Sequence, residues 1–581
     1  MRIRVLAALA LFATPALAAD PSPVPAVHGM VVTAQRLATE VGVDVLRHGG
    51  NAVDAAVAVA YALAVTYPAA GNIGGGGFMT VRLADGRATF LDFREKAPHA
   101  ATPTMFLDAQ GDVVPDRSLK TWLAVGVPGT VAGLEHARAR YGSKPRAELM
   151  APAIRLAHDG FELTPGDLAN FTEANADFRR DPASAMIFLR PDGSPLVPGD
   201  RLVQPELAQT LRRISDLGAP GFYEGPVRDL IVRASREGGG MLAPEDFSGY
   251  KVRELAPVTC GYRGYTIVSS PPPSSGGVTM CEIFQILQGY DLRAMGFHSA
   301  AGVHAMAEAM RLAFRDRNNK LGDPDFVRNP VDHLTSPAYG DQLRAGIDPA
   351  RATPSAQLPA DKPEGQQTTQ FSIADEHGNA VSLTYTLNSW FGARLVAAGT
   401  GIVMNNEMDD FTSKPGVPNQ FGLVQGAANA VAPGKTPLSS MSPTIVTKDG
   451  RVAMVIGSPG GSRIITITLE AISNMIDHGM TVQEAINAPR IHMQWLPDTI
   501  YLERDALSPD TRKALEAEGY KLTDGMPWGI AEGIVAGAPR LTAPPGASSA
   551  GSLDLGTLTL PGATLFGAHD PRGPAGLAAG E

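Results

Sequence analysis

Apolar and polar residues alternate along two neighbouring stretches near the middle of the chain, which is the pattern of a half-buried β-strand. The first stretch starts at Thr368 and the second covers residues 381–386, with turn-forming residues 375–379 between them. This pattern predicts a β-hairpin. If the hairpin centres on His377, antiparallel pairing places Thr386 opposite Thr368, and Asn388 lies just beyond the pair.

The rest of the pattern predicts further strands enclosed by helices. Residues 52–65 are apolar and rich in alanine but interrupted by Asp54, which favours a buried core helix over a membrane span. Longer helical regions are expected at 124–257, 278–317 and 463–478, and further strands at 401–404, 444–447 and 452–456. Strands between two helical layers fit an α/β fold, the four-layer αββα sandwich.

Four consecutive glycines, Gly74 to Gly77, allow two interpretations. A glycine-rich loop binds phosphate when a helix follows it. Here residues 78–81 have the pattern of a strand instead. The glycines are therefore better explained by a place where two backbones cross closely.

Composition narrows the class of protein. The formal net charge is -10 and no block of basic residues is present, which argues against a nucleic-acid partner. The chain opens with two arginines, a short apolar stretch and the small-residue sequence Ala16-Leu17-Ala18. This order is typical of a secretory signal peptide, residues 1–18, and the apolar stretch is too short for a membrane anchor. No membrane span is expected after the signal is removed.

The chain has two cysteines, Cys260 and Cys281, which can pair in an exported protein. The sequence does not fix the distance between their Cα atoms. We expect two separate structural thiols. Neither cysteine has the surroundings of an activated nucleophile.

Thr368 carries the candidate chemistry of the hairpin. A threonine hydroxyl becomes a good nucleophile when its own α-amine is free to take the proton. Thr368 reaches that state only if the bond between Gln367 and Thr368 is broken first. The simpler interpretations are an ordinary strand start at Thr368 and a structural cross-strand pair with Thr386.

A series of motifs along nearly the whole chain decides between these interpretations. It consists of VVTAQRLATEVGVDVLRHGGNAVDAAVAVAYALAV, AAGNIGGGGFM, LDFREKAP, GVPGTVAGL, PPPSSGG, AFRDRN, TTQFSIADEHGNAVSLTYTLNSWFG, GIVMNNEMDDF, PLSSMSPTIV and GSPGGSRIITITLE. In this order the motifs resemble the γ-glutamyltranspeptidases, a branch of the N-terminal-nucleophile hydrolases. The resemblance implies the same αββα fold.

The resemblance also implies self-processing and a substrate. The precursor would cut itself into a large subunit, residues 19–367, and a small subunit, residues 368–581, that together form one fold. Thr368 would then form a γ-glutamyl ester with glutathione or another γ-glutamyl compound and pass it to water, an amino acid or a dipeptide. No cofactor and no metal are implied. A bacterial, periplasmic or secreted location is expected.

Further site residues follow from the motifs. The resemblance gives Thr386 a part in processing and makes Gly460 and Gly461 an oxyanion hole, since backbone N–H groups at a helix start favour anions. The α-carboxylate of the substrate would be bound by Arg94, Ser439 and Ser440, and its ammonium group by Asn388, Glu407 and Asp410. A lone arginine or aspartate is usually a solvated surface charge, so this assignment depends on the whole set.

Three regions depart from the usual family pattern. Gln370 stands where a histidine is frequent, which puts the rate of processing in doubt. Phe421 stands where a lid tyrosine is often found, within the loop-like segment 414–433, which we call the lid segment. The stretch 536–564 is rich in Gly, Pro, Ser and Ala and has the character of a loop insertion.

Two rival functions are considered. A cephalosporin-type acylase uses the same scaffold, but Arg94 and Asp410 suit an amino-acid head group. A non-catalytic periplasmic amino-acid-binding protein would stay as one uncleaved chain.

Overall fold

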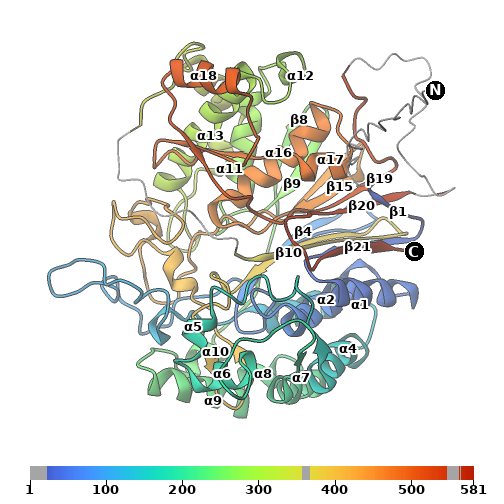
Figure 1. Ribbon diagram of the computed structural model, residues 1–581, viewed down its shortest axis with the longest axis vertical. Helices are drawn as coiled ribbons and strands as arrows, with labels where there is room; N and C mark the ends of the chain where they lie inside the picture. Colours follow the sequence, from blue (N-terminus) through green and yellow to red (C-terminus); the bar gives the residue numbers. More distant parts are fainter. Residues whose placement is uncertain (1–21, 356–366, 546–561, 563) are drawn as a thin grey trace, which may run out of the picture.

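Two seven-stranded antiparallel sheets lie face to face, and helices cover the outer face of each (Figure 1). The computed structural model describes residues 22–355, 367–545, 562 and 564–581. The arrangement confirms the predicted αββα sandwich. The expected signal peptide, residues 1–18, lies outside the described residues, and so does most of the expected insertion at 536–564.

The first sheet contains the predicted hairpin, and we call it the hairpin sheet. Its strand order is β21 (Leu577–Gly580), β2 (Gly29–Thr33), β10 (Thr369–Asp375), β11 (Ala380–Thr386), β3 (Gly76–Arg82), β4 (Ala88–Asp92) and β7 (Arg253–Leu255). The second sheet has the order β1 (Val24–Ala26), β20 (Leu565–His569), β19 (Glu532–Ala536), β15 (Arg451–Gly457), β14 (Thr444–Lys448), β9 (Tyr265–Ser269) and β8 (Val258–Tyr262). Both sheets combine strands from before and after residue 367.

The early helices cover the hairpin sheet. They are α1 (Arg36–Arg47), α2 (Ala52–Thr66), α3 (Thr130–Tyr141), α4 (Arg146–Asp159), α5 (Asn175–Phe178), α6 (Pro182–Phe188), α7 (Pro205–Leu217), α8 (Pro220–Tyr223), α9 (Pro226–Glu237) and α10 (Pro244–Ser248). In this layer α2 contacts β10 and β11 directly, and α1 and α4 pack on α2. Every residue of α2 is buried as a result, which confirms the predicted core helix.

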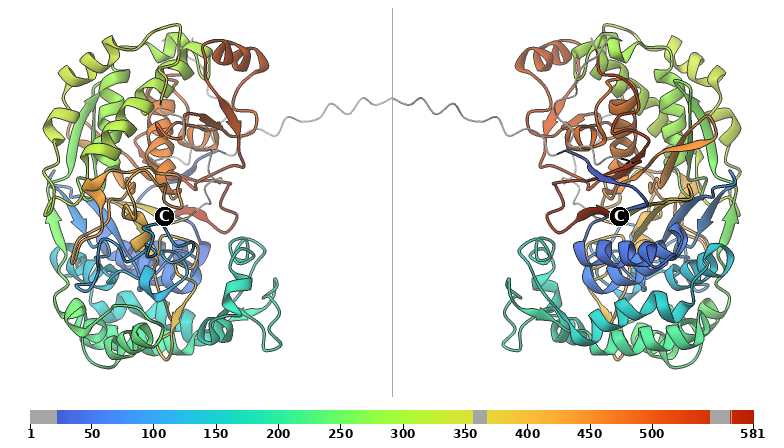
Figure 2. Two further views of the ribbon diagram at one scale, coloured as in Figure 1. Left: turned by 90° about the vertical axis from the view of Figure 1, so that its left-hand side faces the viewer. Right: turned by 90° about the vertical axis from the view of Figure 1, so that its right-hand side faces the viewer.

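The later helices cover the second sheet. They are α11 (Gly276–Leu287), α12 (Leu292–Met295), α13 (Ala300–Lys320), α14 (Val331–Leu334), α15 (Pro337–Ala345), α16 (Ile464–Ile476), α17 (Val482–Asn487) and α18 (Pro509–Ala517). The side views show these two groups of helices at opposite ends of the molecule, with the sheets between them (Figure 2). No helix in the described ranges is long and apolar enough to cross a membrane.

The two faces of the hairpin are both buried, so the prediction of a half-buried strand is wrong. Phe371 and Ile373 pack into the apolar core beneath α2. The alternate, polar side chains face the second sheet, where the hydroxyls of Ser372 and Ser382 donate to the carbonyls of Glu532 and Ile456. The alternation therefore separates two buried environments, an apolar one and a hydrogen-bonded one.

The prediction of two separate thiols is also wrong, because Cys260 and Cys281 form a disulfide. Strands β8 and β9 form a hairpin, and the chain then turns back so that α11 lies against β8. This brings the two Cα atoms to 5.8 Å, within the range that a disulfide needs. The bond ties the outer helical layer to the edge of the second sheet.

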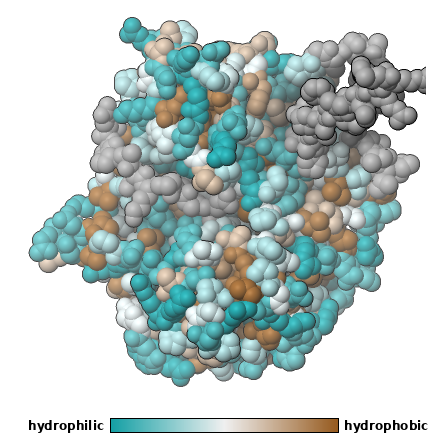
Figure 3. Space-filling model, viewed as in Figure 1, coloured by the Kyte–Doolittle hydropathy of each residue, from teal (hydrophilic) through white to brown (hydrophobic). Residues whose placement is uncertain are grey.

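The glycine run lies where the backbone of β3 crosses its neighbours. A Cβ atom on Gly74 would lie 2.1 Å from the carbonyl oxygen of Val403, and one on Gly75 would lie 2.1 Å from that of Thr386. Only glycine fits such contacts, which confirms the predicted close crossing. On the face seen in Figure 3, hydrophobic side chains are interspersed with hydrophilic ones.

Candidate active site

Thr368 and Thr386 face each other in the register that the hairpin predicts. The last pair of the β10–β11 ladder is Thr369 with Tyr385, so Thr368 and Thr386 form the next pair. Their hydroxyl oxygens are 3.0 Å apart, and both residues are buried. The backbone N–H of Asn388 donates to the Thr386 hydroxyl oxygen at 2.8 Å. Thr386 is therefore held in place beside the predicted nucleophile.

The bond that would be cut is held in an unusual conformation. Thr368 has a φ of 87°, in the left-handed region that β-branched residues rarely adopt. Such strain costs about 1–3 kcal/mol and tends to occur at functional sites. The carbonyl oxygen of Gln367 accepts a hydrogen bond of 2.9 Å from the backbone N–H of Gly460. One predicted oxyanion donor thus already contacts the carbonyl that Thr368 would attack.

That donor belongs to a loop, residues 457–462, which we call the glycine loop. It connects β15 to a short 3-10 turn, Gly461–Arg463, and then to α16. Gly460 and Gly461 have φ values of 136° and 56°, which only glycine adopts readily. A Cβ atom on Gly461 would lie 2.6 Å from the ring of Phe421. The lid segment therefore packs directly on the predicted oxyanion hole.

A single pocket brings the predicted residues together. Its wall includes the nucleophile pair, the substrate-binding set, one predicted oxyanion glycine and residues of the lid segment. It is lined by Arg94, Arg317, Thr368, Thr386, Asn388, Glu407, Asp410, Phe421, Leu423, Leu438, Ser439, Ser440, Met441, Gly461, Ser462 and Ile464.

Opposite charges pair with one another at one end of this pocket. Arg94 contacts Glu407 at 2.6 Å and Asp410 at 2.5 Å, and its Nε donates to the carbonyl of Pro437. Arg94 and Glu407 are almost fully buried. The predicted cation for the substrate carboxylate and the predicted anions for the substrate ammonium are thus adjacent.

The carboxyl groups around Arg94 outnumber it. Burial raises the pKa of Glu95 to about 7, and Arg94 opposes that shift. Burial also raises the pKa of Glu407 and of Asp410, again against the opposing effect of Arg94. One guanidinium therefore faces three carboxyl groups and neutralises only part of their charge.

The two predicted serines line the pocket together with an arginine that sequence reasoning missed. Arg317 in α13 donates to the Ser440 hydroxyl at 2.9 Å and to the Ser275 hydroxyl at 2.8 Å. The Ser439 hydroxyl oxygen accepts from the N–H of Met441. In the sequence, Arg317 belongs to the run AFRDRN and resembles any charged residue on a helix. Its burial is the signal that identifies it, and only the fold supplies that signal.

Two asparagines lie at the end of β11 that carries Thr386. Asn388 has a φ of 75°, and its side chain donates to the carbonyl of Asn406. Asn72, which sequence reasoning also missed, donates to the carbonyl of Thr386 at 2.9 Å and accepts from the N–H of Gly75 at 3.0 Å. These bonds hold the strand end that carries Thr386.

Gln370, the first departure from the family pattern, has a structural explanation. Its side chain accepts from the Thr384 hydroxyl at 2.5 Å and donates to the Ser382 hydroxyl at 2.9 Å. A Cβ atom on Gly457 would lie 2.5 Å from its amide group. Gln370 therefore fills the space between the two sheets next to the glycine loop.

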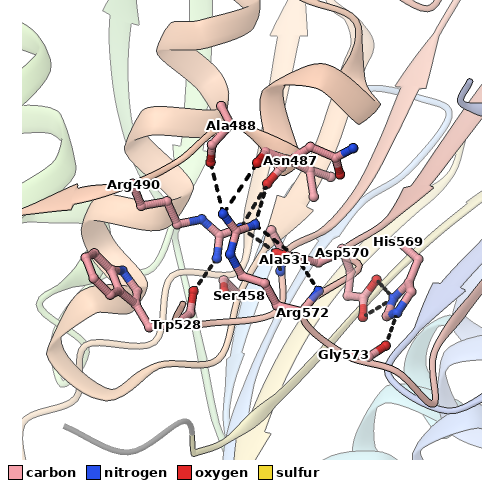
Figure 4. Close-up of polar contacts among 12 residues, drawn as sticks. Ser458, Asn487, Ala488, Arg490, Trp528, Ala531, His569, Asp570, Arg572 and Gly573 are labelled. Atoms are coloured by element: carbon pink, nitrogen blue, oxygen red, sulfur yellow. Dashed lines mark hydrogen bonds and ion pairs between the residues drawn. The ribbon is translucent and has the colours of Figure 1, made fainter. Parts of the chain in front are cut away.

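A buried charge cluster supports the glycine loop from behind (Figure 4). Arg490 and Arg572 both bind Asp570, which also accepts from the N–H of Ala531 at 2.9 Å. Arg490 also donates to the carbonyl of Trp528. These bonds hold the segment 528–531, where a Cβ atom on Gly529 would lie 3.0 Å from both the Ser458 hydroxyl and the Pro459 carbonyl. The cluster thus positions the loop that presents Gly460.

The chain is similar to known proteins along most of its length. The family model described as Gamma-glutamyltranspeptidase matches residues 38–549. A glutathione hydrolase proenzyme of Pseudomonas sp. (strain A14) is 55% identical over 97% of this chain and 96% of its own length. The glutathione hydrolase proenzyme of Escherichia coli (strain K12) is 46% identical, over 96% of this chain and 93% of its own.

A solved structure extends the comparison to the fold. The cephalosporin acylase from Bacillus halodurans superposes with a TM-score of 0.81, covering 98% of this chain and 99% of its own, at 27% identity. Its similarity covers nearly the whole length of both chains.

Proposed function

Since this chain belongs to the gamma-glutamyltranspeptidase family, we propose that it is a self-processing γ-glutamyltransferase and glutathione hydrolase. The observation that carries the proposal is the meeting of three features at one bond. The strained Thr368 lies beside the Thr386 hydroxyl, and the Gln367 carbonyl already accepts from Gly460.

Self-processing begins with attack of the Thr368 hydroxyl on the Gln367 carbonyl carbon. Negative charge then develops on the carbonyl oxygen that faces the Gly460 N–H, where a preorganised donor stabilises it. The hydroxyl proton passes to the nitrogen of Thr368 as the C–N bond breaks, which gives an ester on Thr368 and frees its α-amine. Water hydrolyses the ester and leaves Gln367 as a carboxylate. Relief of the left-handed backbone favours this reaction.

Turnover uses the same groups again. The new α-amine, with a reference pKa of about 8, takes the proton from the Thr368 hydroxyl as it attacks a γ-glutamyl amide. The α-amine passes this proton to the leaving amine, which departs, and a γ-glutamyl ester remains on Thr368. Water or the amine of an amino acid or dipeptide then attacks that ester. Gly460 and Gly461 face the oxyanion in both steps.

The charged end of the pocket would hold the amino-acid head group. Glu407, Asp410 and Asn388 receive the substrate ammonium. Arg94, Ser439 and Ser440 receive the α-carboxylate, and Arg317 supports Ser440. Because Arg94 already pairs with Glu407 and Asp410, a zwitterionic head group meets both a cation and anions at this end of the pocket.

Processing would leave two subunits that stay together. The large subunit, residues 19–367, and the small subunit, residues 368–581, each contribute strands to both sheets. Separating them would break the hydrogen-bond ladders of both sheets. We propose export through the signal peptide at residues 1–18 to the periplasm or the medium.

The rival acylase function predicts a different response to the α-amino group of the substrate. The test compares a γ-glutamyl anilide with the glutaryl anilide that lacks this group, in wild type, Asp410→Asn and the exposed control Asp510→Asn. Truncating one partner of a buried charged hydrogen bond costs about 2–5 kcal/mol, so Asp410→Asn should lower kcat/KM at least tenfold for the γ-glutamyl anilide alone. Equal rates on both anilides in the wild type would favour the acylase function.

A further inference from the structure

Gln494 lies behind the pocket and bonds to two of the segments that line it. Its Nε2 donates to the Phe421 carbonyl in the lid segment at 3.2 Å, and to the Leu496 carbonyl at 3.4 Å. Its Oε1 accepts from the Ser462 hydroxyl of the glycine loop at 2.5 Å and contacts the Nε2 atom of His492 at 2.9 Å. Gln494 is 2% exposed.

The two segments it joins meet at the reacting centre. Phe421, Gly461 and Ser462 all line the pocket with Thr368. The Phe421 ring packs against Gly461, one of the two proposed oxyanion glycines. We propose that Gln494 is a positioning residue that couples the lid segment to the glycine loop, so that the lid closes only over a correctly placed oxyanion hole.

The chemistry of this position requires an amide. The Phe421 carbonyl needs a donor, whereas the Ser462 hydroxyl needs an acceptor, and glutamine supplies both from one planar group. His492 stays neutral, because burial lowers its pKa to about 3 and Arg463 adds to that effect. The His492 Nδ1 lies 2.9 Å from the Thr466 hydroxyl, which also donates to the Arg463 carbonyl at 3.1 Å. In the tautomer with its proton on Nε2, His492 donates to the Gln494 Oε1 at 2.9 Å and favours this orientation of the amide.

Gln494 does not touch the reacting atoms, and its effect passes through Phe421 and Ser462. Loss of the Gln494 N–H donors frees the Phe421 carbonyl, so the lid segment loosens and water gains access to the ester on Thr368. Loss of its acceptor releases Ser462, which lies two residues after Gly460. A displaced Gly460 would slow both self-cleavage and turnover. The effect on turnover rests on the proposed γ-glutamyl transfer and hydrolysis, whereas the effect on self-cleavage rests only on the proposed processing at Thr368.

Two substitutions separate these effects. Gln494→Met keeps the shape but loses the hydrogen bonds to Phe421, Leu496, Ser462 and His492. Gln494→Glu keeps the acceptor for Ser462 and His492 but turns a carboxylate oxygen toward the Phe421 carbonyl. The matched control is Gln483→Met, because Gln483 is also buried and its amide donates to the Asn487 side chain and the His569 carbonyl rather than to the lid segment.

The experiment follows precursor cleavage on denaturing gels and measures hydrolysis and transfer products from a γ-glutamyl anilide with a dipeptide acceptor. Gln494→Met should slow self-cleavage roughly three- to tenfold, since a buried group left unpaired costs about 1–3 kcal/mol. Gln494→Glu should cleave itself close to the wild-type rate but shift products toward hydrolysis, roughly two- to fivefold. Gln483→Met should change neither readout.

Two results would overturn the proposal. In the first, both Gln494 variants cleave themselves at the same rate as Gln483→Met and give the same ratio of products. In the second, Gln494→Glu gives the same ratio of hydrolysis to transfer products as the wild type. If instead the wild type cleaves itself but releases no product from the anilide, the proposed function fails, and the self-cleavage rates still test Gln494.

Discussion

The hydroxyl oxygens of Thr368 and Thr386 lie 3.0 Å apart, one residue pair beyond the ladder that joins β10 to β11. The Asn388 N–H holds Thr386 from the other side at 2.8 Å. The pair therefore places a second hydroxyl against the proposed nucleophile while the bond to Gln367 is still intact.

The first prediction concerns this pair. Thr386→Val removes the hydroxyl but keeps the shape, and it leaves the Asn388 N–H and the Thr368 hydroxyl without that partner. A buried group left unpaired costs about 1–3 kcal/mol, so self-cleavage should slow roughly tenfold, and Thr386→Ser should restore it. The time course of precursor cleavage measures this.

Thr384 provides the matched control. It lies on the same face of β11, but its hydroxyl donates to Gln370 rather than to Thr368. If Thr386→Val and Thr384→Val cleave at the same rate, the hydroxyl of Thr386 has no special part in processing.

The second prediction concerns Phe421 and Asn388, which line the same pocket. Phe421→Tyr adds a hydroxyl that can bond to Asn388 and tighten the lid segment. A neutral hydrogen bond contributes about 1 kcal/mol, so the ratio of transfer to hydrolysis should rise by roughly a few-fold. Quantifying both products with a dipeptide acceptor tests this. An unchanged ratio would mean that Phe421 only packs the lid segment onto Gly461.

The sequence predicts the hairpin register because that register is local. Period-two alternation and a turn centred on His377 suffice to place Thr386 opposite Thr368. The same alternation does not reveal that both faces of β10 are buried, because that depends on α2 and on the second sheet, which come from distant parts of the chain.

The same difference between local patterns and contacts of distant segments applies to the site. Motif resemblance brings Arg94, Glu407 and Asp410 together, and the fold confirms that they lie in one pocket. Resemblance does not reveal that they pair with one another. Neither Arg317 nor Gln494 carries a local signal of its own, since a charged or amide side chain is usually solvated. The pairing of Cys260 with Cys281 depends in the same way on how α11 packs against β8.

The third prediction concerns that disulfide, which closes a loop of 21 residues between β8 and α11. In the chain-entropy model a loop of this size contributes about 3 kcal/mol. Replacing both cysteines by serine should therefore lower the unfolding free energy by about 3 kcal/mol. Adding reductant should lower the unfolding free energy of the wild type but not that of the double variant. Equal values for the two proteins without reductant would contradict this.

The fourth prediction concerns Glu470 in α16. Its Oε1 accepts from the Ile491 N–H, and its buried Oε2 has no hydrogen-bond partner within the part of the chain that the structure describes. Burial raises the pKa of Glu470 from 4.5 to about 8. Between these values the folded state binds more protons than the unfolded state, so stability falls as pH rises through this window.

Glu470→Gln removes that dependence. The unfolding free energy of Glu470→Gln minus that of the wild type should be larger at pH 8 than at pH 5. For the exposed control Glu516→Gln this difference should be the same at both pH values. Urea unfolding of the three proteins at both pH values gives the comparison. If the difference in unfolding free energy between the wild type and Glu470→Gln is the same at pH 5 and pH 8, the raised pKa of Glu470 is contradicted.

The most direct test of the account is the intact mass of the purified protein and of its Thr368→Ala variant. The wild type should yield two chains whose masses place the break between Gln367 and Thr368, with Thr368 at the N-terminus of the smaller chain. Thr368→Ala should remain one chain and release no product from a γ-glutamyl anilide. A wild type that stays whole, or a Thr368→Ala variant that is cut efficiently at the same bond, would contradict the claim that Thr368 is the nucleophile.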